Sequence, residues 1–248
     1  MASTRGTVAA RLDDRLNHRL DRLDWDALAA ALDADGFAVT PPLLTVAECG
    51  ALARLFADRR RFRSTVDMAR HRFGVGEYRY FALPLPPLVA ALRTHAYRRL
   101  VPIANAWMAR LGVPERHPPE LDAFLARCAA GGQRRPTPLL LRYAAGGYNC
   151  LHQDVYGALG FPLQLTCMLS RPGRDFTGGE FLLVEQRPRA QSRGEVVALG
   201  QGEVVIFANR HRPVRGTRGD YRATVRHGVS RIHTGERTTL GVIFHDAT

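Results

Sequence analysis

The chain has 248 residues, of which 46% are hydrophobic and 23% are charged, and this composition is ordinary for a folded globular protein. No apolar run reaches the roughly 18 residues of a membrane-spanning helix, and the N-terminal stretch resembles neither a secretory signal nor a transit peptide. The formal net charge of +12 rests on arginine alone, because the sequence contains no lysine. We therefore expect a cytoplasmic protein without membrane contact, and the basic charge is weak evidence for a nucleic-acid partner.

Four cysteines are scattered along the chain, at Cys49, Cys128, Cys150 and Cys167. They show none of the paired spacing that a structural zinc site requires, and their wide separation does not indicate a disulfide framework. We expect all four to be reduced thiols.

The first part of the chain shows helical periodicity. Three segments are expected to be helical, namely residues 25–37, 45–62 and 86–112. Thr45 followed by Glu48 is the capping-box pattern at a helix start, and Pro102 is a possible interruption of the last segment. The sequence therefore predicts a mainly helical N-terminal region, residues 1–132, that packs on the rest of the molecule.

From residue 133 onward the pattern changes to short segments rich in Val, Ile, Leu, Phe and Thr, separated by Gly, Pro, Asn or Arg. The segments expected to be strands are residues 138–143, 163–170, 179–186, 195–200, 202–209, 221–229 and 238–245. This rhythm favours a jelly roll (double-stranded β-helix) of the cupin type over residues 133–248. The predicted fold class is α+β.

An arginine-rich stretch, residues 209–231, carries seven arginines and one acidic residue, Asp220. One interpretation is a solvated loop. The other is that the arginines from Arg210 to Arg231, among them Arg212, Arg215 and Arg218, form a rim that binds phosphates beside an active site.

His152 and Asp154 are separated by one residue, after the Gly pair that follows Tyr143. Side chains alternate along an extended segment, so these two can face the same point. A second histidine would complete the two-histidine, one-carboxylate facial triad of non-heme Fe(II) oxygenases, which leaves coordination positions open. The candidates downstream are His211, His227, His233 and His245.

His227 differs from the other candidates in its spacing to an arginine. Ten residues later, at the start of an apolar strand, stands Arg237, which shares a strand face with Thr239 and Gly241. A guanidinium can hold a carboxylate through two parallel hydrogen bonds, so an arginine there suits the far end of a dicarboxylate. The pattern predicts a metal site and an anion site together.

Over residues 137–245 the chain resembles the Fe(II)/2-oxoglutarate-dependent oxygenases, whose signature is His-x-Asp, a distal His and a basic residue shortly after it. The spacing is closest to the prolyl 4-hydroxylase-like branch, in which Tyr-x-x-Gly-Gly begins nine residues before the first His. The resemblance implies that His152, Asp154 and His227 bind the catalytic Fe(II), and that Arg237 and Tyr143 bind 2-oxoglutarate. It also implies that O₂ is consumed and succinate and CO₂ are released.

More narrowly, the chain is similar to a bacterial group of 2-oxoglutarate oxygenases provisionally linked to oxidative demethylation of damaged DNA. The well-known demethylases of alkylated bases carry a second Arg six residues after the first, and here that position is Ile243. Three alternatives therefore stay open: a nucleic-acid demethylase, a prolyl or other peptide or amino-acid hydroxylase, and a non-catalytic binder on the same barrel.

Several other residues have two interpretations. Tyr148, Asn149, Gln153 and Tyr156 flank the predicted metal ligands and would line a substrate pocket or simply pack the loop. Residues 62–81 would cover the mouth of the pocket or connect a helix to a strand. His245 and Asp246 resemble a ligand pair, but they lack the His-x-Asp spacing.

Overall fold

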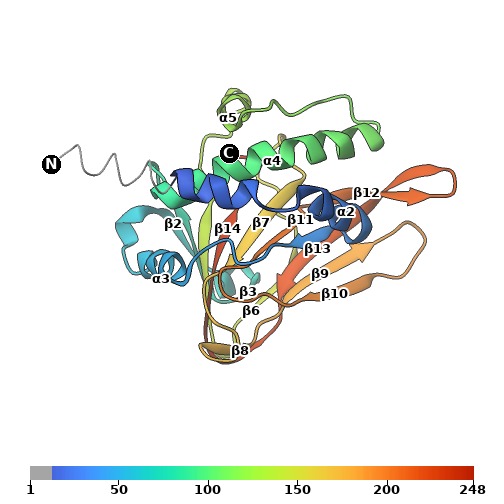
Figure 1. Ribbon diagram of the computed structural model, residues 1–248. Coiled ribbons are helices and arrows are strands. Elements are labelled where there is room, and N and C mark those ends of the chain that lie inside the picture. The colour runs from blue at the N-terminus through green and yellow to red at the C-terminus, as the bar shows by residue number, and fades with distance from the viewer. Residues whose placement is uncertain (1–12) are drawn as a thin grey trace.

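The computed structural model describes residues 13–248 (Figure 1). Residues 13–21 are helical. The later helices are α2 (Trp25–Asp35), α3 (Val46–Leu55), α4 (Pro87–Arg110) and α5 (Leu121–Ala130), with two short 3₁₀ turns, η1 (Arg59–Arg61) and η2 (Met68–His71). In Figure 1 the helices α2, α4 and α5 lie together on one side of the strands, and α3 lies at their edge.

The helices begin and end where their residues provide caps. Thr45 and Glu48 form the predicted capping box, in which each side chain accepts a hydrogen bond from the other residue's backbone. Gly36 ends α2 in a left-handed conformation with φ of 81°. The predicted interruption at Pro102 does not occur, because α4 continues through it. Twelve buried residues along α4 hold the helix together where the proline removes a hydrogen bond.

Two antiparallel sheets pack face to face. The strands are β1 (Phe37–Val39), β2 (Phe62–Asp67), β3 (Gly74–Val75), β4 (Glu77–Phe81), β5 (Leu139–Ala144), β6 (Tyr148–His152), β7 (Leu163–Met168), β8 (Phe176–Gly178), β9 (Phe181–Gln186), β10 (Arg193–Val197), β11 (Val204–Ala208), β12 (His211–Gly216), β13 (Gly219–Val229) and β14 (Ile232–Val242). The larger sheet runs β1-β11-β7-β14-β5-β4-β2, with β8 on β14, and the smaller runs β10-β9-β13-β6-β3, with β12 on β13.

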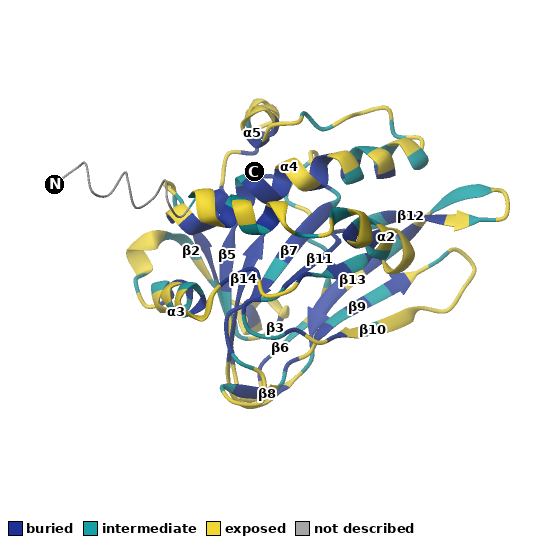
Figure 2. Ribbon diagram, viewed as in Figure 1, coloured by how far each residue is buried: buried dark blue, intermediate teal, exposed yellow. Residues whose placement is uncertain are grey.

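The two faces of the larger sheet have different neighbours. Leu140, Cys167 and Leu240 pair side by side across it and belong to the core that includes the helices. The residues between them in each strand, such as Leu139 and Thr166, face the smaller sheet and line a cavity. Figure 2 shows the resulting buried layer between the helices and the strands. The helices thus cover one face of the larger sheet and leave the other to a pocket between the sheets.

The N-terminal region also contributes four strands. β2 and β4 extend the larger sheet beyond β5, β1 adds to its other edge, and β3 adds to the smaller sheet. Of the helix predicted over residues 45–62, only Val46–Leu55 is α-helical, because η1 follows and β2 begins at Phe62. The division of the chain into residues 1–132 and 133–248 stays a prediction.

The arginine-rich stretch, residues 209–231, is not a loop, because it contains the whole of β12 and β13, which pair as a hairpin. Arg212 is completely buried and pairs with Glu185, so it cannot belong to an exposed phosphate-binding rim. Arg215 and Arg218 are exposed, and Arg215 lies 3.9 Å from Asp220.

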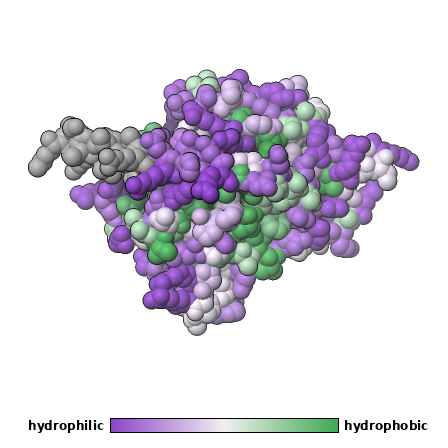
Figure 3. Space-filling view, viewed as in Figure 1, coloured by the Kyte–Doolittle hydropathy of each residue, from purple (hydrophilic) through white to green (hydrophobic). Residues whose placement is uncertain are grey.

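The surface in Figure 3 is mostly hydrophilic, with hydrophobic residues gathered in small patches. None of the helices in the described part of the chain is long and apolar enough to cross a membrane. All four cysteines are free thiols, and three of them are buried.

Candidate active site

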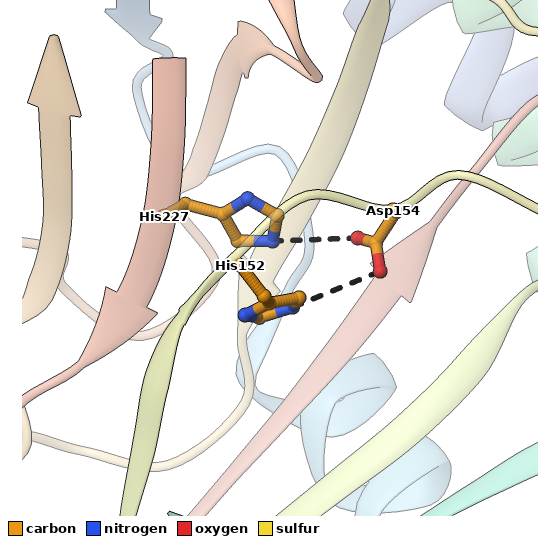
Figure 4. Close-up of side chains that lie close together, drawn as sticks. All are labelled: His152, Asp154 and His227. Atoms are coloured by element: carbon orange, nitrogen blue, oxygen red, sulfur yellow. Dashed lines mark ion pairs between the residues drawn. The ribbon is translucent and has the colours of Figure 1, made fainter. Parts of the chain in front are cut away.

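Three side chains converge between the two sheets. The ligand atoms of His152, Asp154 and His227 all lie within 4.8 Å of one another. The Nε2 atom of His227 is 3.3 Å from Oδ2 of Asp154, and the Nε2 atom of His152 is 3.7 Å from Oδ1 (Figure 4). Figure 4 shows the two imidazole rings side by side, with the carboxylate facing both. Two nitrogens and one oxygen in this arrangement can hold a divalent transition metal on one face.

Strand pairing places these residues. β6 and β13 are neighbours in the smaller sheet, and His152 is the register partner of His227. Asp154 follows the end of β6 by two residues, and the side chain of Asn209 holds its backbone. The Asn209 oxygen accepts from the Asp154 N–H at 3.1 Å, and the Asn209 amide donates to the Asp154 carbonyl at 2.8 Å. The corner after β11 therefore fixes the position of the carboxylate.

Both oxygens of the Asp154 carboxylate also accept side-chain hydrogen bonds. Tyr156 donates to Oδ1 at 2.6 Å, and Gln164 donates to Oδ2 at 2.9 Å. Tyr80 in turn donates to the Tyr156 hydroxyl at 2.8 Å. Such partners orient a ligating group before a metal arrives.

The charges at the site favour metal binding. Burial alone would raise the pKa of Asp154, but the hydrogen bond and charge of His227, with His152 and Tyr156, hold the pKa of this carboxyl below its usual range. Burial lowers the pKa of His227, and the neighbouring His152 adds to that effect. At neutral pH the site therefore offers a carboxylate and an uncharged imidazole, the forms that coordinate metals.

A buried arginine lies in the same cavity. Arg237 is 1% exposed, yet its Nε and Nη2 atoms have no hydrogen-bond partner in the described chain. Its guanidinium carbon lies 5.8 Å from the centre of the Tyr143 ring, since the two residues pair across β14 and β5. Asn149 donates to the Tyr143 hydroxyl at 3.3 Å, so the hydroxyl proton is left free for another acceptor.

The protonation states of Arg237 and Tyr143 favour the binding of an anion. Burial lowers the pKa of Arg237 to about 10, which still leaves the guanidinium charged at pH 7. Burial raises the pKa of Tyr143, so its phenol is neutral and can donate. An unpaired buried cation is costly, and a carboxylate that accepted from both residues would remove that cost.

The cavity has a volume of about 430 Å³. One wall contains Tyr78 and Tyr80, whose rings meet edge to face at 5.4 Å, and Tyr156 packs edge to face on Tyr80 at 6.0 Å. The cluster of His152, Asp154 and His227 lines this cavity together with Arg237, so two ligands bound at these points would be neighbours. Ile243, at the position where the alkylated-base demethylases carry a second Arg, also lines it.

The other candidate histidines lie elsewhere. His233 is exposed on β14, and His211 is partly buried on β12, against Thr224. His245 is buried and accepts a hydrogen bond from the backbone N–H of Phe161, while Asp246 pairs with Arg93. Among the histidines of residues 13–248, only His152 and His227 belong to the three-residue cluster.

Three residues that support Asp154, namely Gln164, Tyr80 and Asn209, were not among the predicted site residues. One signal was available for Gln164, because a glutamine between leucines in a buried strand needs a polar partner. Tyr80 and Asn209 reach Asp154 only through the tertiary fold, so no local pattern marks them. Of the residues that flank the predicted ligands, Asn149, Gln153 and Tyr156 line the cavity.

Comparison with known proteins identifies the family. Residues 76–247 match a family described as "Oxygenase, catalysing oxidative methylation of damaged DNA". The match covers more than half of the chain, and the chain therefore belongs to this family. Two relatives, the uncharacterized proteins MT2286 and Rv2227 of Mycobacterium tuberculosis strains, are 48% identical over 196 residues, which is 77% of this chain and 83% of theirs.

Solved structures share the fold. A prolyl-4-hydroxylase of Pseudomonas putida superposes with a TM-score of 0.54 at 15% identity, over 90% of this chain and 100% of that one. An oxidoreductase of the 2OG-Fe(II) oxygenase family from Burkholderia pseudomallei gives a TM-score of 0.52 at 18% identity, over 92% and 94%. The predicted α+β fold with a double-stranded β-helix is confirmed. By its family the protein is an oxygenase, and it has the fold of the 2OG-Fe(II) oxygenases.

Proposed function

We propose that His152, Asp154 and His227 bind the catalytic Fe(II), and that Arg237 and Tyr143 bind 2-oxoglutarate. The observation that carries this assignment is the buried, unpartnered guanidinium of Arg237 in the same cavity as the three-residue cluster. A five-carbon dicarboxylate has one end that can chelate a metal and another that can pair with an arginine.

Bound here, Fe(II) would supply the activation of O₂ that couples decarboxylation of 2-oxoglutarate to hydroxylation of a C–H bond. The chain's own residues prepare the site. Tyr156 and Gln164 orient the Asp154 carboxylate, and Arg237 with Tyr143 fixes the far carboxylate of the cosubstrate. The aromatic wall of the cavity excludes water from the reacting groups.

For the substrate, we propose an N-alkylated base in nucleic acid. Membership of a family described as acting on damaged DNA supports this choice. Hydroxylation of an N-methyl carbon gives an unstable carbinolamine, which loses formaldehyde and leaves the free nitrogen. The chemistry of the proposed site would therefore remove methyl groups from the base.

A prolyl or other peptide or amino-acid hydroxylase is the alternative. It is favoured by the position of Arg237 ten residues after His227. The prolyl-4-hydroxylase of Pseudomonas putida supports the likeness of fold alone, at 15% identity.

The metal assignment is tested by His152→Ala and His227→Ala, with His233→Ala as the matched control on an exposed histidine. We expect calorimetric titration with Fe(II) under anaerobic conditions to show no specific binding in the first two variants and wild-type binding in the control. Full iron occupancy in either ligand variant would remove the triad assignment.

The substrate is tested by succinate release from the Fe(II)-loaded enzyme, with methylated DNA oligonucleotides, prolyl peptides and free amino acids compared at equal concentration. We expect release above the substrate-free rate with the oligonucleotides. Turnover on peptides, with none on any nucleic acid, would replace the demethylase proposal by the hydroxylase alternative.

A further inference from the structure

An exposed aromatic side chain stands at the mouth of the active-site cavity. Phe73 lines the cavity and is 47% exposed, although it belongs to the most hydrophobic class of residues. The ring of His71 stacks on it, with centroids 5.4 Å apart and an angle of 22° between the planes. A planar stack is thus already present beside the reacting site, with the Phe73 ring still partly open to solvent.

This aromatic pair is held against the strand that carries His152. β3 pairs with β6 through Gly74 and Val75, and the carbonyl of Phe73 accepts from the N–H of Cys150 at 2.8 Å. Gly74 has φ of 134°, and a Cβ there would lie 2.3 Å from the Tyr148 carbonyl oxygen. Only glycine allows this approach, so the backbone beneath Phe73 has a defined position relative to the metal-binding cluster.

Arg72 precedes Phe73 and also lines the cavity. It has φ of 59°, and within residues 13–248 only Arg189 shares a positive φ among the residues other than glycine. This conformation is unfavourable for residues other than glycine, and residues that adopt it nevertheless often lie at functional sites. Arg72 is exposed, and no ion pair involves it in the described structure.

The charges inside the cavity leave Arg72 uncompensated. With the proposed ligands bound, Fe(II) contributes two positive charges and Arg237 one. These balance the single negative charge of Asp154 and the two negative charges of 2-oxoglutarate. Among the residues of the described chain that line the cavity, Arg72 is then the remaining formal charge. The mouth therefore favours a substrate that carries negative charge next to the reacting group.

We propose that Phe73 and Arg72 bind the nucleotide next to the reacting one in a single strand of nucleic acid. Phe73 stacks on the neighbouring base, and Arg72 pairs with the phosphate between the two nucleotides. This inference rests on the nucleic-acid substrate proposed above. Proteins bind single strands without sequence preference by stacking bases on aromatic side chains and by placing positively charged side chains along the phosphate backbone of the nucleic acid.

The experiment compares a five-nucleotide DNA strand carrying one N-methylated adenine with the corresponding free nucleoside. The ratio of kcat/KM for the strand to kcat/KM for the nucleoside measures the contribution of the neighbouring nucleotides. It is determined for the Fe(II)-loaded wild type, Phe73→Leu, Phe73→Trp, Arg72→Gln and Arg189→Gln. Arg189 is the matched control, because it has the same φ of 59° but lies in the turn between β9 and β10, away from the β3–β6 end of the molecule (Figure 1).

We expect the ratio to fall about 10-fold in Phe73→Leu and to recover in Phe73→Trp, which restores an aromatic face. Arg72→Gln should reduce the salt dependence of strand binding, measured by fluorescence anisotropy, by a log–log slope of about 0.7. Arg189→Gln should behave as the wild type does.

Two outcomes would overturn the inference while leaving the proposed substrate in place. One is a wild type that shows no preference for the strand over the nucleoside, and the other is a Phe73→Leu variant with an unchanged ratio. A wild type that releases succinate with neither compound but acts on peptides overturns the proposed substrate itself, and this inference with it.

Discussion

Two buried arginines in this protein have opposite surroundings. Arg212, on β12, has no exposed surface and is fully partnered: Glu185 pairs with its Nε, and the carbonyls of Asp33 and Ala34 accept from its other nitrogens at 2.8 and 3.1 Å. Gly36 makes this contact possible, because a Cβ there would lie 2.7 Å from the Arg212 side chain. The arginine joins the end of α2 to the smaller sheet.

Arg237 is buried as deeply and lines the cavity, but two of its nitrogens have no hydrogen-bond partner among residues 13–248. A folded protein does not keep a charge in this state without a reason, since the desolvation is uncompensated. Burial alone therefore does not distinguish an arginine that could bind a ligand from one that stabilises the fold. Arg237, which we propose binds 2-oxoglutarate, is distinguished from Arg212 by the missing partner, which a ligand would supply.

The largest expected effect is that of a substitution at Arg237, the arginine that lines the cavity. Arg237→Met should raise the apparent KM for 2-oxoglutarate by a factor corresponding to roughly 2–5 kcal/mol, because a charge-assisted pair in a dry pocket is lost. The thermal unfolding temperature should stay the same or rise, since an unpaired buried charge is removed. Steady-state kinetics and calorimetry of the same preparation measure both. An unchanged KM would mean that another residue holds the carboxylate.

Arg212→Met should give the reverse result. It leaves Glu185 buried with only Arg187 as a partner and removes two hydrogen bonds to the end of α2, so we expect a loss of about 3 kcal/mol in the free energy of unfolding. The KM for 2-oxoglutarate of the folded fraction should not change. Urea unfolding followed by circular dichroism measures the loss. A stability equal to that of the wild type would show that Arg212 is not the structural member of the pair.

Asp154 combines features of both arginines. It lines the cavity as Arg237 does, and both of its carboxylate oxygens have hydrogen-bond partners, as the nitrogens of Arg212 do. Tyr156→Phe removes the 2.6 Å hydrogen bond to Oδ1 and keeps the ring that packs on Tyr80. We expect about a 10-fold loss of Fe(II) affinity, since a ligand with a missing partner is less well oriented. Calorimetric titration under anaerobic conditions measures it. Tyr78→Phe, which leaves Asp154 untouched, is the control.

His117 illustrates a third response to burial, which is to remain uncharged. Burial, with the nearby charges of Arg127 and His245, lowers its pKa to about 4. In the unfolded chain a histidine takes up a proton near pH 6.5, so between pH 6.5 and 4 the unfolded state binds more protons than the folded state. This residue therefore costs stability as the pH falls through that range.

The smallest expected effect concerns this loss of stability in acid. In His117→Phe the loss of unfolding free energy between pH 7 and pH 5 should be smaller than in the wild type, because the substituted ring cannot be protonated. The new ring would keep the edge-to-face contact with Phe124. Urea unfolding at several pH values measures the difference. Parallel pH profiles for the two proteins would assign the acid sensitivity to other groups.

Much of the site follows from local sequence. The His-x-Asp spacing keeps His152 and Asp154 close together, although Asp154 lies beyond the end of β6, and alternation along β14 carries Arg237 to the face that lines the cavity. Because these relations depend only on residues close together, the fold class and the type of chemistry were predictable before any contact was known. The order of the four spaced elements, from Tyr143 to Arg237, was sufficient to indicate the family.

The choice among four histidines and the partners of Asp154 were decided by tertiary structure. His227 reaches the cluster because β13 pairs with β6 in a particular register, while Asn209, just after β11, and Tyr80, on β4, come from parts of the chain distant in sequence. The arginine-rich stretch likewise became a hairpin with a buried Arg212, because its partner Glu185 lies on the strand that pairs with the other side of β13. A shift of register by one residue would turn every side chain of a strand to the opposite face, so the position of His227 opposite His152 depends on how β13 and β6 pair within the sheet and not on either strand alone.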